Sequence, residues 1–390
     1  MFKGIRPTNN WKVPFDQADM YFQVGDQKTY NRNQAIVWAN GDTDKISLYW
    51  MNEVWDAVDW SVPPTRSWAD LMRERCWQVR DKADILGVSY SGGYDSQTIV
   101  DHMILNRVPL DELQINVKKY HRHPEGETTP LLAQKIKDNF YPNVKIRTIE
   151  IGLDYLLGIY QNYGEDWLFK QDTGRLHFTQ TVRSSTINHN QEHSRLLDIR
   201  NIVMCEGIEK PRLFVQDGWW VTGYHDDCLI HVMNTPYEHF YVSRDLPELH
   251  IKQVWMMVDW LESLPYTNAG DLEQYMHSVQ KHEDDHTYEQ WNRAVGRNPV
   301  HHINSWSMEH NHKRTGEGGM YSTDARATLD YNKIWDRPEV KMWKSTAEQF
   351  IKQYNNAFVS DSGNTKHIWT KLYRIKPVEP GRTKGKLLIS

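Results

Sequence analysis

The hydrophobic and polar positions between residues 67 and 152 change period several times, from a helical repeat to short apolar runs. Residues 67–82 repeat apolar side chains every three to four positions, and Ser67 stands three residues before Asp70, which is typical of a capped helix. Strand and helix in alternation predict a parallel sheet with helices packed on its faces. After the first helix, strands are predicted at 85–90, 113–120 and 144–151, and helices at 95–107 and 129–140.

The segments on either side of this region follow other patterns. Residues 1–66 are rich in Trp, Tyr and Asn and contain short strand-like runs such as 45–51. Later in the chain we predict a strand at 201–207, a hairpin turning at Asp217-Gly218, and helices near 153–162, 191–199, 250–264 and 346–358.

We therefore expect an α/β protein whose core is a parallel sheet. It has three predicted parts: an aromatic-rich N-terminal strand and loop segment (1–66), a parallel-sheet domain (67–245) and a mainly helical C-terminal region with a basic tail (246–390). The boundaries follow from the changes of pattern.

Composition narrows the class of protein. With 390 residues the chain is too long for one ordinary domain, and its 17 tryptophans and 20 tyrosines supply large side chains for packed cores. No apolar run reaches the roughly 20 residues of a membrane span, and the net charge of −5 predicts no global attraction to nucleic acid. Three well-separated cysteines form neither a disulfide framework nor a paired metal motif. We expect a protein of the reducing cytoplasm without membrane association.

The junction between the predicted strand 85–90 and the helix 95–107 reads Ser91-Gly92-Gly93-Tyr94-Asp95-Ser96. Two glycines let the backbone turn tightly and approach a bound group, and the start of the helix presents N–H groups and the positive end of its dipole. Serine hydroxyls add hydrogen-bond donors. A carboxylate is unfavourable beside bare phosphate but suits a Mg²⁺ ion that bridges phosphate oxygens. The junction therefore predicts a phosphate site with bound magnesium.

This SGGYDS sequence resembles the SGGxDS signature of the PP-loop ATP pyrophosphatases, also called adenine nucleotide alpha hydrolase-like proteins. Asparagine-synthetase-like and phage-encoded members are the most similar in character, and the resemblance covers residues 80–230. It implies that the chain cleaves ATP to AMP and pyrophosphate, adenylates an acceptor and transfers nitrogen to it, with ATP and Mg²⁺ as cofactors. The implied nucleotide-binding residues are Ser89, Ser91, Gly92, Gly93, Tyr94, Asp95 and Ser96.

The same resemblance implies two further candidates outside the junction. Family members carry a lysine-bearing loop after a later strand, which makes Lys210 a candidate catalytic residue together with Asp95. Residues 221–229 loosely resemble the acidic segment of asparagine synthetases, which implies Asp226 as a second metal ligand beside Asp95. The histidine-rich stretch 277–312 places His282 and His286 four positions apart beside Asp285, but it has neither an HExxH motif nor a cysteine partner, so solvated histidines are the better interpretation.

Several alternatives stay open. The few cysteines argue against sulfur transfer and a four-cysteine zinc site, and Phe2 stands where one class of glutaminase has its nucleophile. Nitrogen would then come from ammonia, an amine or a separate donor protein.

The acceptor is a small molecule or, given the basic runs 116–123 and 376–390, a nucleic acid. A catalytically silent nucleotide-binding module of a larger assembly, such as a viral one in the host cytoplasm, is the other hypothesis. The oligomeric state is not indicated.

Overall fold

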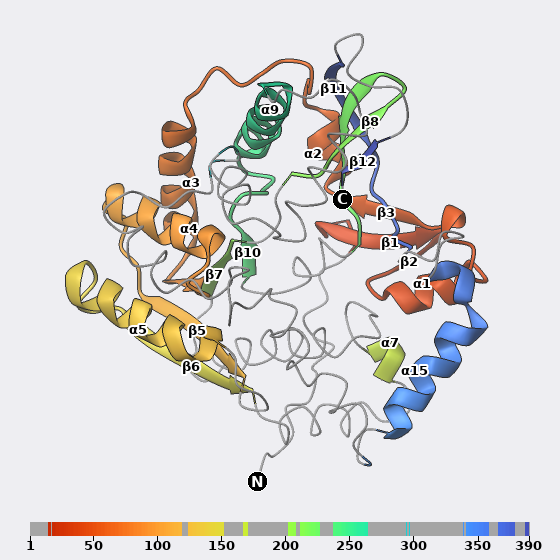
Figure 1. Cartoon of the computed structure of the whole chain (residues 1–390), viewed down its shortest axis with the longest axis horizontal. Coiled ribbons are helices and arrows are strands. Elements are labelled where there is room, and N and C mark those ends of the chain that lie inside the picture. The colour runs from red at the N-terminus through yellow and green to blue at the C-terminus, as the bar shows by residue number, and fades with distance from the viewer. Residues whose placement is uncertain are drawn as a thin grey trace.

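The structure is a computed structural model. It describes residues 15–16, 18–118, 124–151, 167–170, 202–207, 211–226, 237–263, 294, 296, 338, 341–358, 366–378 and 387–389. Within these residues the strands form three sheets of five, three and four strands. In Figure 1 the five-stranded sheet lies on the left and the three-stranded sheet on the right, with the C-terminal strands above it.

The five-stranded sheet confirms the predicted parallel core. Its order is β10-β7-β4-β5-β6, and every neighbouring pair is parallel. The chain forms β4, β5 and β6 in turn toward one edge of the sheet. It then returns to form β7 beside β4, and β10 at the other edge, which is the order of a Rossmann-like sheet. The strands are β4 (Ile85–Ser89), β5 (Glu112–Lys118), β6 (Lys145–Ile151), β7 (Ile202–Glu206) and β10 (Tyr237–His239).

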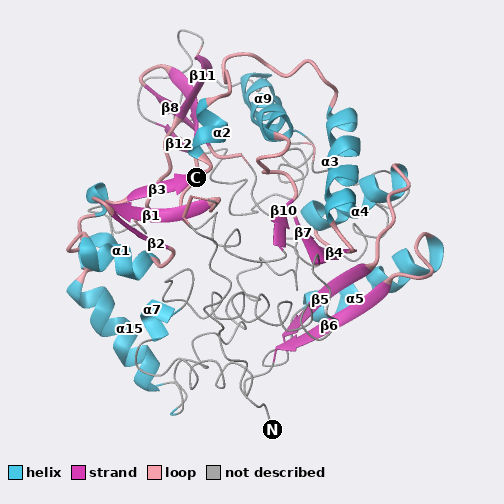
Figure 2. Ribbon diagram, turned by 180° about the vertical axis from the view of Figure 1, so that it is seen from behind, coloured by secondary structure: helices cyan, strands magenta, loops and turns pink. Residues whose placement is uncertain are grey.

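Three helices pack against this sheet and overlap the predicted ranges, although the third begins at Pro124, earlier than the predicted residue 129. They are α3 (Trp68–Lys82), α4 (Tyr94–Leu105) and α5 (Pro124–Asn139). Ser67 caps α3 by accepting a hydrogen bond from the backbone N–H of Asp70 at 3.1 Å, as the capping pattern predicts. Helix α4 lies against β4 and α3, and α5 lies against β5 (Figure 2). Gly87 of β4 leaves space for Met204 of β7, because a Cβ there would lie 2.3 Å from the Met204 sulfur.

The three-stranded sheet is built by the N-terminal segment. Its strands β1 (Met20–Val24), β2 (Gln27–Thr29) and β3 (Ser47–Trp50) pair antiparallel in the order β2-β1-β3. Two helices, α1 (Arg32–Trp38) and α2 (Asn52–Asp56), and the 3-10 turn η2 (Thr43–Lys45) complete this part. Helix α1 contacts β1 and the short helix α7 (Trp167–Lys170).

The four-stranded sheet joins segments that are far apart in the sequence. The hairpin of β8 (Leu213–Gln216) and β9 (Trp219–Thr222) pairs with β12 (Leu387–Ile389) and β11 (Tyr373–Pro377), all antiparallel. The hairpin turns at Asp217 and Gly218, as predicted, with φ of 52° and 77°, the signs that a two-residue hairpin turn favours.

The C-terminal region is only partly as expected. The predicted helices at 250–264 and 346–358 correspond to α9 (Pro247–Ser263) and α15 (Lys341–Gln353), with the 3-10 turn η6 (Asn355–Ala357) after α15. A mainly helical character is not confirmed, because the region also supplies β11 and β12.

Other expectations lie outside what the structure describes. The helices expected near 153–162 and 191–199 and the histidine-rich stretch 277–312 fall outside the described residues, apart from Gly296 and residue 294. The three-part division stays a prediction, and the four-stranded sheet crosses its boundary at 245. Within the described part of the chain, no helix combines the length and apolar character needed to cross a membrane.

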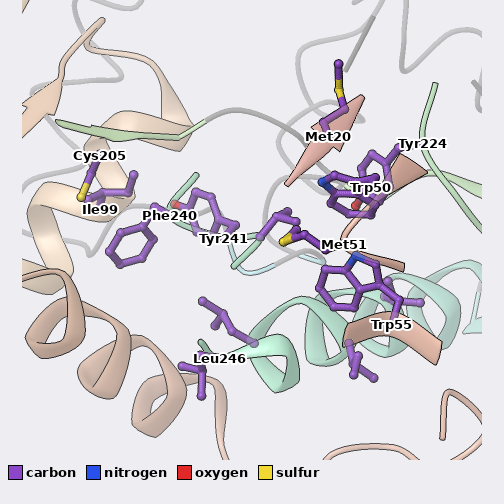
Figure 3. Close-up of a cluster of buried hydrophobic side chains, with 14 of the residues drawn as sticks. Met20, Trp50, Met51, Trp55, Ile99, Cys205, Tyr224, Phe240, Tyr241 and Leu246 are labelled. Carbon is purple, nitrogen blue, oxygen red and sulfur yellow. The ribbon is translucent and has the colours of Figure 1, made fainter. Parts of the chain in front are cut away.

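An aromatic cluster connects the N-terminal segment to the later elements (Figure 3). The Trp50 ring lies 4.4 Å from the Tyr224 ring, and the Trp60 ring stacks on Tyr373 of β11 at 5.0 Å. Trp55 packs edge-on to His250 of α9 at 5.4 Å, and both side chains are 0% exposed. Because one buried hydrophobic cluster contains residues of all three sheets, the elements pack as one body.

Replacing Trp55 tests this packing. Trp55→Ala should lower the free energy of unfolding by about 3–5 kcal/mol, because a large cavity is left among aromatic rings. The matched control is Trp77→Ala, whose ring is 41% exposed and whose loss should change stability by only about 0.5 kcal/mol. Urea unfolding followed by tryptophan fluorescence and circular dichroism measures both. Equal losses for the two variants would contradict the packing described.

Candidate functional site

The strand order places a topological switch point at the carboxyl ends of β4 and β7. From β4 the chain continues to β5 on one side of the sheet, whereas β7 is followed by β10 on the other side. In open α/β sheets, ligands bind where neighbouring connections diverge in this way. Residues 90–96 follow β4, and Gly207 follows β7. The SGGYDS junction therefore lies at the switch point of the sheet.

The backbone of the junction requires its first glycine. Gly92 has φ of +71°, in the left-handed region, and a Cβ there would lie 2.9 Å from Leu132 Cδ1 of α5. The hydroxyl of Thr129, also on α5, donates a hydrogen bond to the Ser91 carbonyl at 2.9 Å. Gly93 is extended and stands at the N-cap position of α4. The loop is thus pressed against α5 in a shape that suits glycine at position 92.

The two serines of the junction bond to its own backbone. Ser91 N–H donates to Ser96 Oγ at 3.2 Å, and the two hydroxyl oxygens are 3.3 Å apart. The Ser96 hydroxyl also donates to the Gly93 carbonyl at 3.3 Å, and Gly93 N–H donates to Ser91 Oγ at 3.4 Å. Ser96 is 4% exposed, and Ser91 is half-buried. These contacts link the start of the loop to the first turn of α4.

The first turn of α4 is packed against the end of β7. A Cβ at Gly207 would lie 2.7 Å from the carbonyl carbon of Asp95 and 2.9 Å from the Ser96 nitrogen, so the position accepts no side chain without a shift of the helix. From the segment that follows β10, the Tyr241 hydroxyl donates to the Asp95 carbonyl oxygen at 2.9 Å. The Asp95 residue itself is half-buried. Its backbone is therefore fixed by residues that follow β7 and β10.

A buried arginine holds the segment that carries Tyr241. Arg75 of α3 is 0% exposed and donates to the Phe240 carbonyl at 2.8 Å and to the Glu238 carboxylate at 2.6 Å. Burial works to raise the pKa of Glu238, but Arg75 and Lys82 together hold that pKa below its ordinary value. Glu238 is thus an ionised partner of the buried arginine, and the pair anchors β10 to α3.

A polar network beneath the junction ties α4 to the end of β4. The Tyr90 hydroxyl donates to Gln97, whose amide donates to the Asp101 carboxylate at 2.7 Å. All three side chains are buried, and burial together with the nearby Asp101 carboxylate raises the Tyr90 pKa far above 10. Tyr90 therefore stays a neutral donor, and this network lies in the buried core.

The sequence-predicted residues fall into three groups. The junction residues Ser91 to Ser96 lie together at the switch point, with Tyr94 buried and Ser89 half-buried at the end of β4. Lys210 lies outside the described residues, so its catalytic role stays a prediction. Asp226 lies past β9, next to the four-stranded sheet, is 2% exposed and forms an ion pair with Arg32. Its sharing of a metal with Asp95 also stays a prediction.

Sequence reasoning did not identify the residues that hold the loop from outside. Gly207 carries a usable signal, since a glycine directly after a predicted parallel strand indicates a close backbone approach. Thr129 and Tyr241 carry none, because their roles depend on packing between segments far apart in the chain.

Comparisons with known proteins add little to this geometry. No protein-family model matches the chain, and none of the curated proteins matches it. Among solved structures, the chain is similar to NMN synthetase from Francisella tularensis, with 15% identity, 64% of this chain and 96% of that chain covered, and a TM-score of 0.29. Similarity at that TM-score assigns neither a fold nor a function, so the chain's own residues carry the interpretation.

The conformation of Gly92 can be tested against a second glycine. Gly218 also has positive φ, at +77°, but a Cβ there would meet nothing within 4 Å. Gly218→Ala should therefore lower the free energy of unfolding by only about 1–2 kcal/mol, the cost of a left-handed backbone for alanine. Gly92→Ala should lower the free energy of unfolding by about 1–3 kcal/mol more than Gly218→Ala does, because Leu132 or the loop must move. Urea unfolding measures both, and equal losses would show that the loop is not pressed on α5.

Proposed function

We propose that the chain binds ATP with its triphosphate in the 91–96 loop and cleaves it to AMP and pyrophosphate, as PP-loop ATP pyrophosphatases do. One observation carries the proposal. The SGGYDS sequence forms the junction between a parallel strand and a buried helix at the switch point of the sheet, with Gly92 in the left-handed region. Both the motif and its structural setting are those expected of a phosphate-binding loop.

The local electrostatics support an anion at this position. The start of α4 carries the positive end of a 12-residue helix dipole, equivalent to roughly half a unit charge. Gly93, at the N-cap position, has no side chain to compete for the helix N–H groups. The loop is already held in place by α5, β7 and Tyr241, so binding would require little reordering.

The half-buried Asp95 carboxylate fits a magnesium site beside these phosphates. Mg²⁺ prefers one or two carboxylate oxygens together with phosphate oxygens and water. The bound ion would neutralise charge on the leaving pyrophosphate. Lys210 is the proposed second source of positive charge, and the loop N–H groups are the proposed donors to the phosphate oxygens.

The proposed reaction has two steps. An acceptor oxygen attacks the α-phosphorus, the bond to the bridging α–β oxygen breaks, and pyrophosphate leaves with the electron pair. A nitrogen nucleophile, either ammonia or an amine, then displaces AMP from the adenylated acceptor. A small-molecule acceptor is the better proposal, because a net charge of −5 offers little general attraction to nucleic acid. The nitrogen step rests on the sequence resemblance.

Asp95→Asn tests the proposed role of the loop. With ATP labelled at the α and γ positions, ammonia and pools of candidate acceptors, the wild-type chain should release AMP and pyrophosphate. Loss of the charge should slow AMP formation about a hundred- to thousand-fold, the typical effect of removing one charge-stabilising group. The melting temperature should change little, because a carboxylate at a helix start contributes only about 0.3–1 kcal/mol.

Asp84→Asn is the matched control, since this exposed carboxylate lies at the opposite end of the same strand. It should leave AMP formation unchanged. Release of ADP and phosphate instead of AMP would contradict the reaction, and unchanged turnover in Asp95→Asn would contradict the site. If ATP raises the melting temperature while no acceptor pool gives AMP, the chain is a silent nucleotide-binding module.

A further inference from the structure

A cluster of metal-ligating side chains lies away from the phosphate loop. One ligand atom from each of His225, Asp226 and His367 lies within 4.8 Å of the other two. His225 and Asp226 are 5% and 2% exposed, and the His367 side chain is 23% exposed. The cluster follows β9 of the four-stranded sheet, whereas the loop follows β4 of the parallel sheet.

The backbone holds the three side chains on two paired segments. Asp226 N–H donates to the Ile368 carbonyl at 2.9 Å, and Thr370 N–H donates to the Tyr224 carbonyl at 2.8 Å. Between these bonds, residues 225 and 369 form an isolated antiparallel bridge. Segments about 140 positions apart in the chain therefore present the cluster from a fixed scaffold, as a preorganised ligand site requires.

Asp226 is oriented by groups on both of its oxygens. Arg32 of α1 forms an ion pair with Oδ2, and its guanidinium also donates to the carbonyls of Ala357 at 3.2 Å and Lys366 at 3.1 Å. The Ile368 N–H donates to Oδ1 at 3.3 Å. Carboxylates that ligate metals are commonly held by outer hydrogen bonds of this kind. Oδ1 is also the oxygen nearer to His367.

The spacing of the cluster suits a bound ion. His367 Nδ1 lies 3.4 Å from Asp226 Oδ1, longer than the usual range of a good N–H···O hydrogen bond. Two ligands at about 2.0–2.1 Å from a tetrahedral zinc ion are separated by roughly 3.4 Å. The His225 and His367 rings stack, with centroids 4.2 Å apart and planes inclined by 25°. One ligand atom of each ring lies within 4.8 Å of the other ring's ligand atom and of an Asp226 oxygen, so rotation of the stacked rings would direct both imidazoles to one ion beside the carboxylate.

We propose that His225, Asp226 and His367 bind one divalent transition-metal ion, with Zn²⁺ the best match. Two imidazoles and one carboxylate form a donor set that zinc accepts, and three protein ligands leave one coordination position for water or a further group. The ion would link the 225–226 segment to residue 367 and, through Arg32, to α1. This assignment of Asp226 replaces the predicted sharing of a metal with Asp95, and it does not depend on the proposed nucleotide chemistry.

The test uses the full chain after treatment with a chelator. Calorimetric titration should show that each chain binds one equivalent of Zn²⁺ tightly. Co²⁺ should give the strong visible absorption of a tetrahedral site. His367→Gln should weaken that equivalent by more than the ~10–100-fold typical of lost outer-shell partners. Zn²⁺ should raise the melting temperature of the wild type but not of His367→Gln. The matched control is His102→Gln on α4, a half-buried histidine outside the cluster, which should bind as the wild type does.

Two results would overturn the proposal. One is the absence of a tight Zn²⁺ equivalent in the wild-type chain, which needs no variant. The other is a tight equivalent that survives unchanged in His367→Gln, as zinc held by the seven histidines of residues 277–312 would do. Circular dichroism of the metal-free variant separates lost ligation from lost folding. If His367→Gln fails to fold, His225→Gln replaces it, with the same expected loss.

Discussion

The first turn of α4 lies so close to the end of β7 that only a residue without a side chain fits between them. Gly207 occupies that position, with the Asp95 carbonyl carbon 2.7 Å from where a Cβ would stand. A second glycine, Gly87 of β4, leaves room for the side chain of Met204, its partner on β7. The contact between Gly207 and Asp95 determines where α4 begins relative to β4 and β7.

Side chains outside the parallel sheet form hydrogen bonds that support the loop and the first turn of α4. Arg75 fixes the segment after β10, Tyr241 on that segment bonds to the backbone of Asp95, and Thr129 of α5 bonds to Ser91. Preorganised donors stabilise developing charge better than donors that must first reorient. The Tyr241 ring also stacks on Trp68 at the start of α3, at a centroid distance of 6.3 Å. A rigid loop is therefore built from contacts between distant segments.

Local patterns in the sequence predicted the local structure well. The Ser67 cap, the turn at Asp217-Gly218 and the alternation of strands and helices each depend on residues within a few positions of one another. Pairings over long separations left no such signal. The strands β11 and β12 pair with hairpin strands about 155 and 175 residues earlier, and Asp226 pairs with Arg32, 194 positions away. The candidate loop was visible because its chemistry lies in six consecutive residues, whereas its supports come from four other segments.

The central claim is that the junction of β4 and α4 binds the phosphates of ATP. Hydrogen–deuterium exchange of the full chain, with and without ATP and Mg²⁺, tests it most directly, because bound phosphate slows exchange of the amides that contact it. The account predicts slower exchange in peptides covering residues 90–97, also with pyrophosphate alone, and no change in the hairpin 213–222. Slower exchange confined to other peptides, or no effect of saturating ATP, would contradict it.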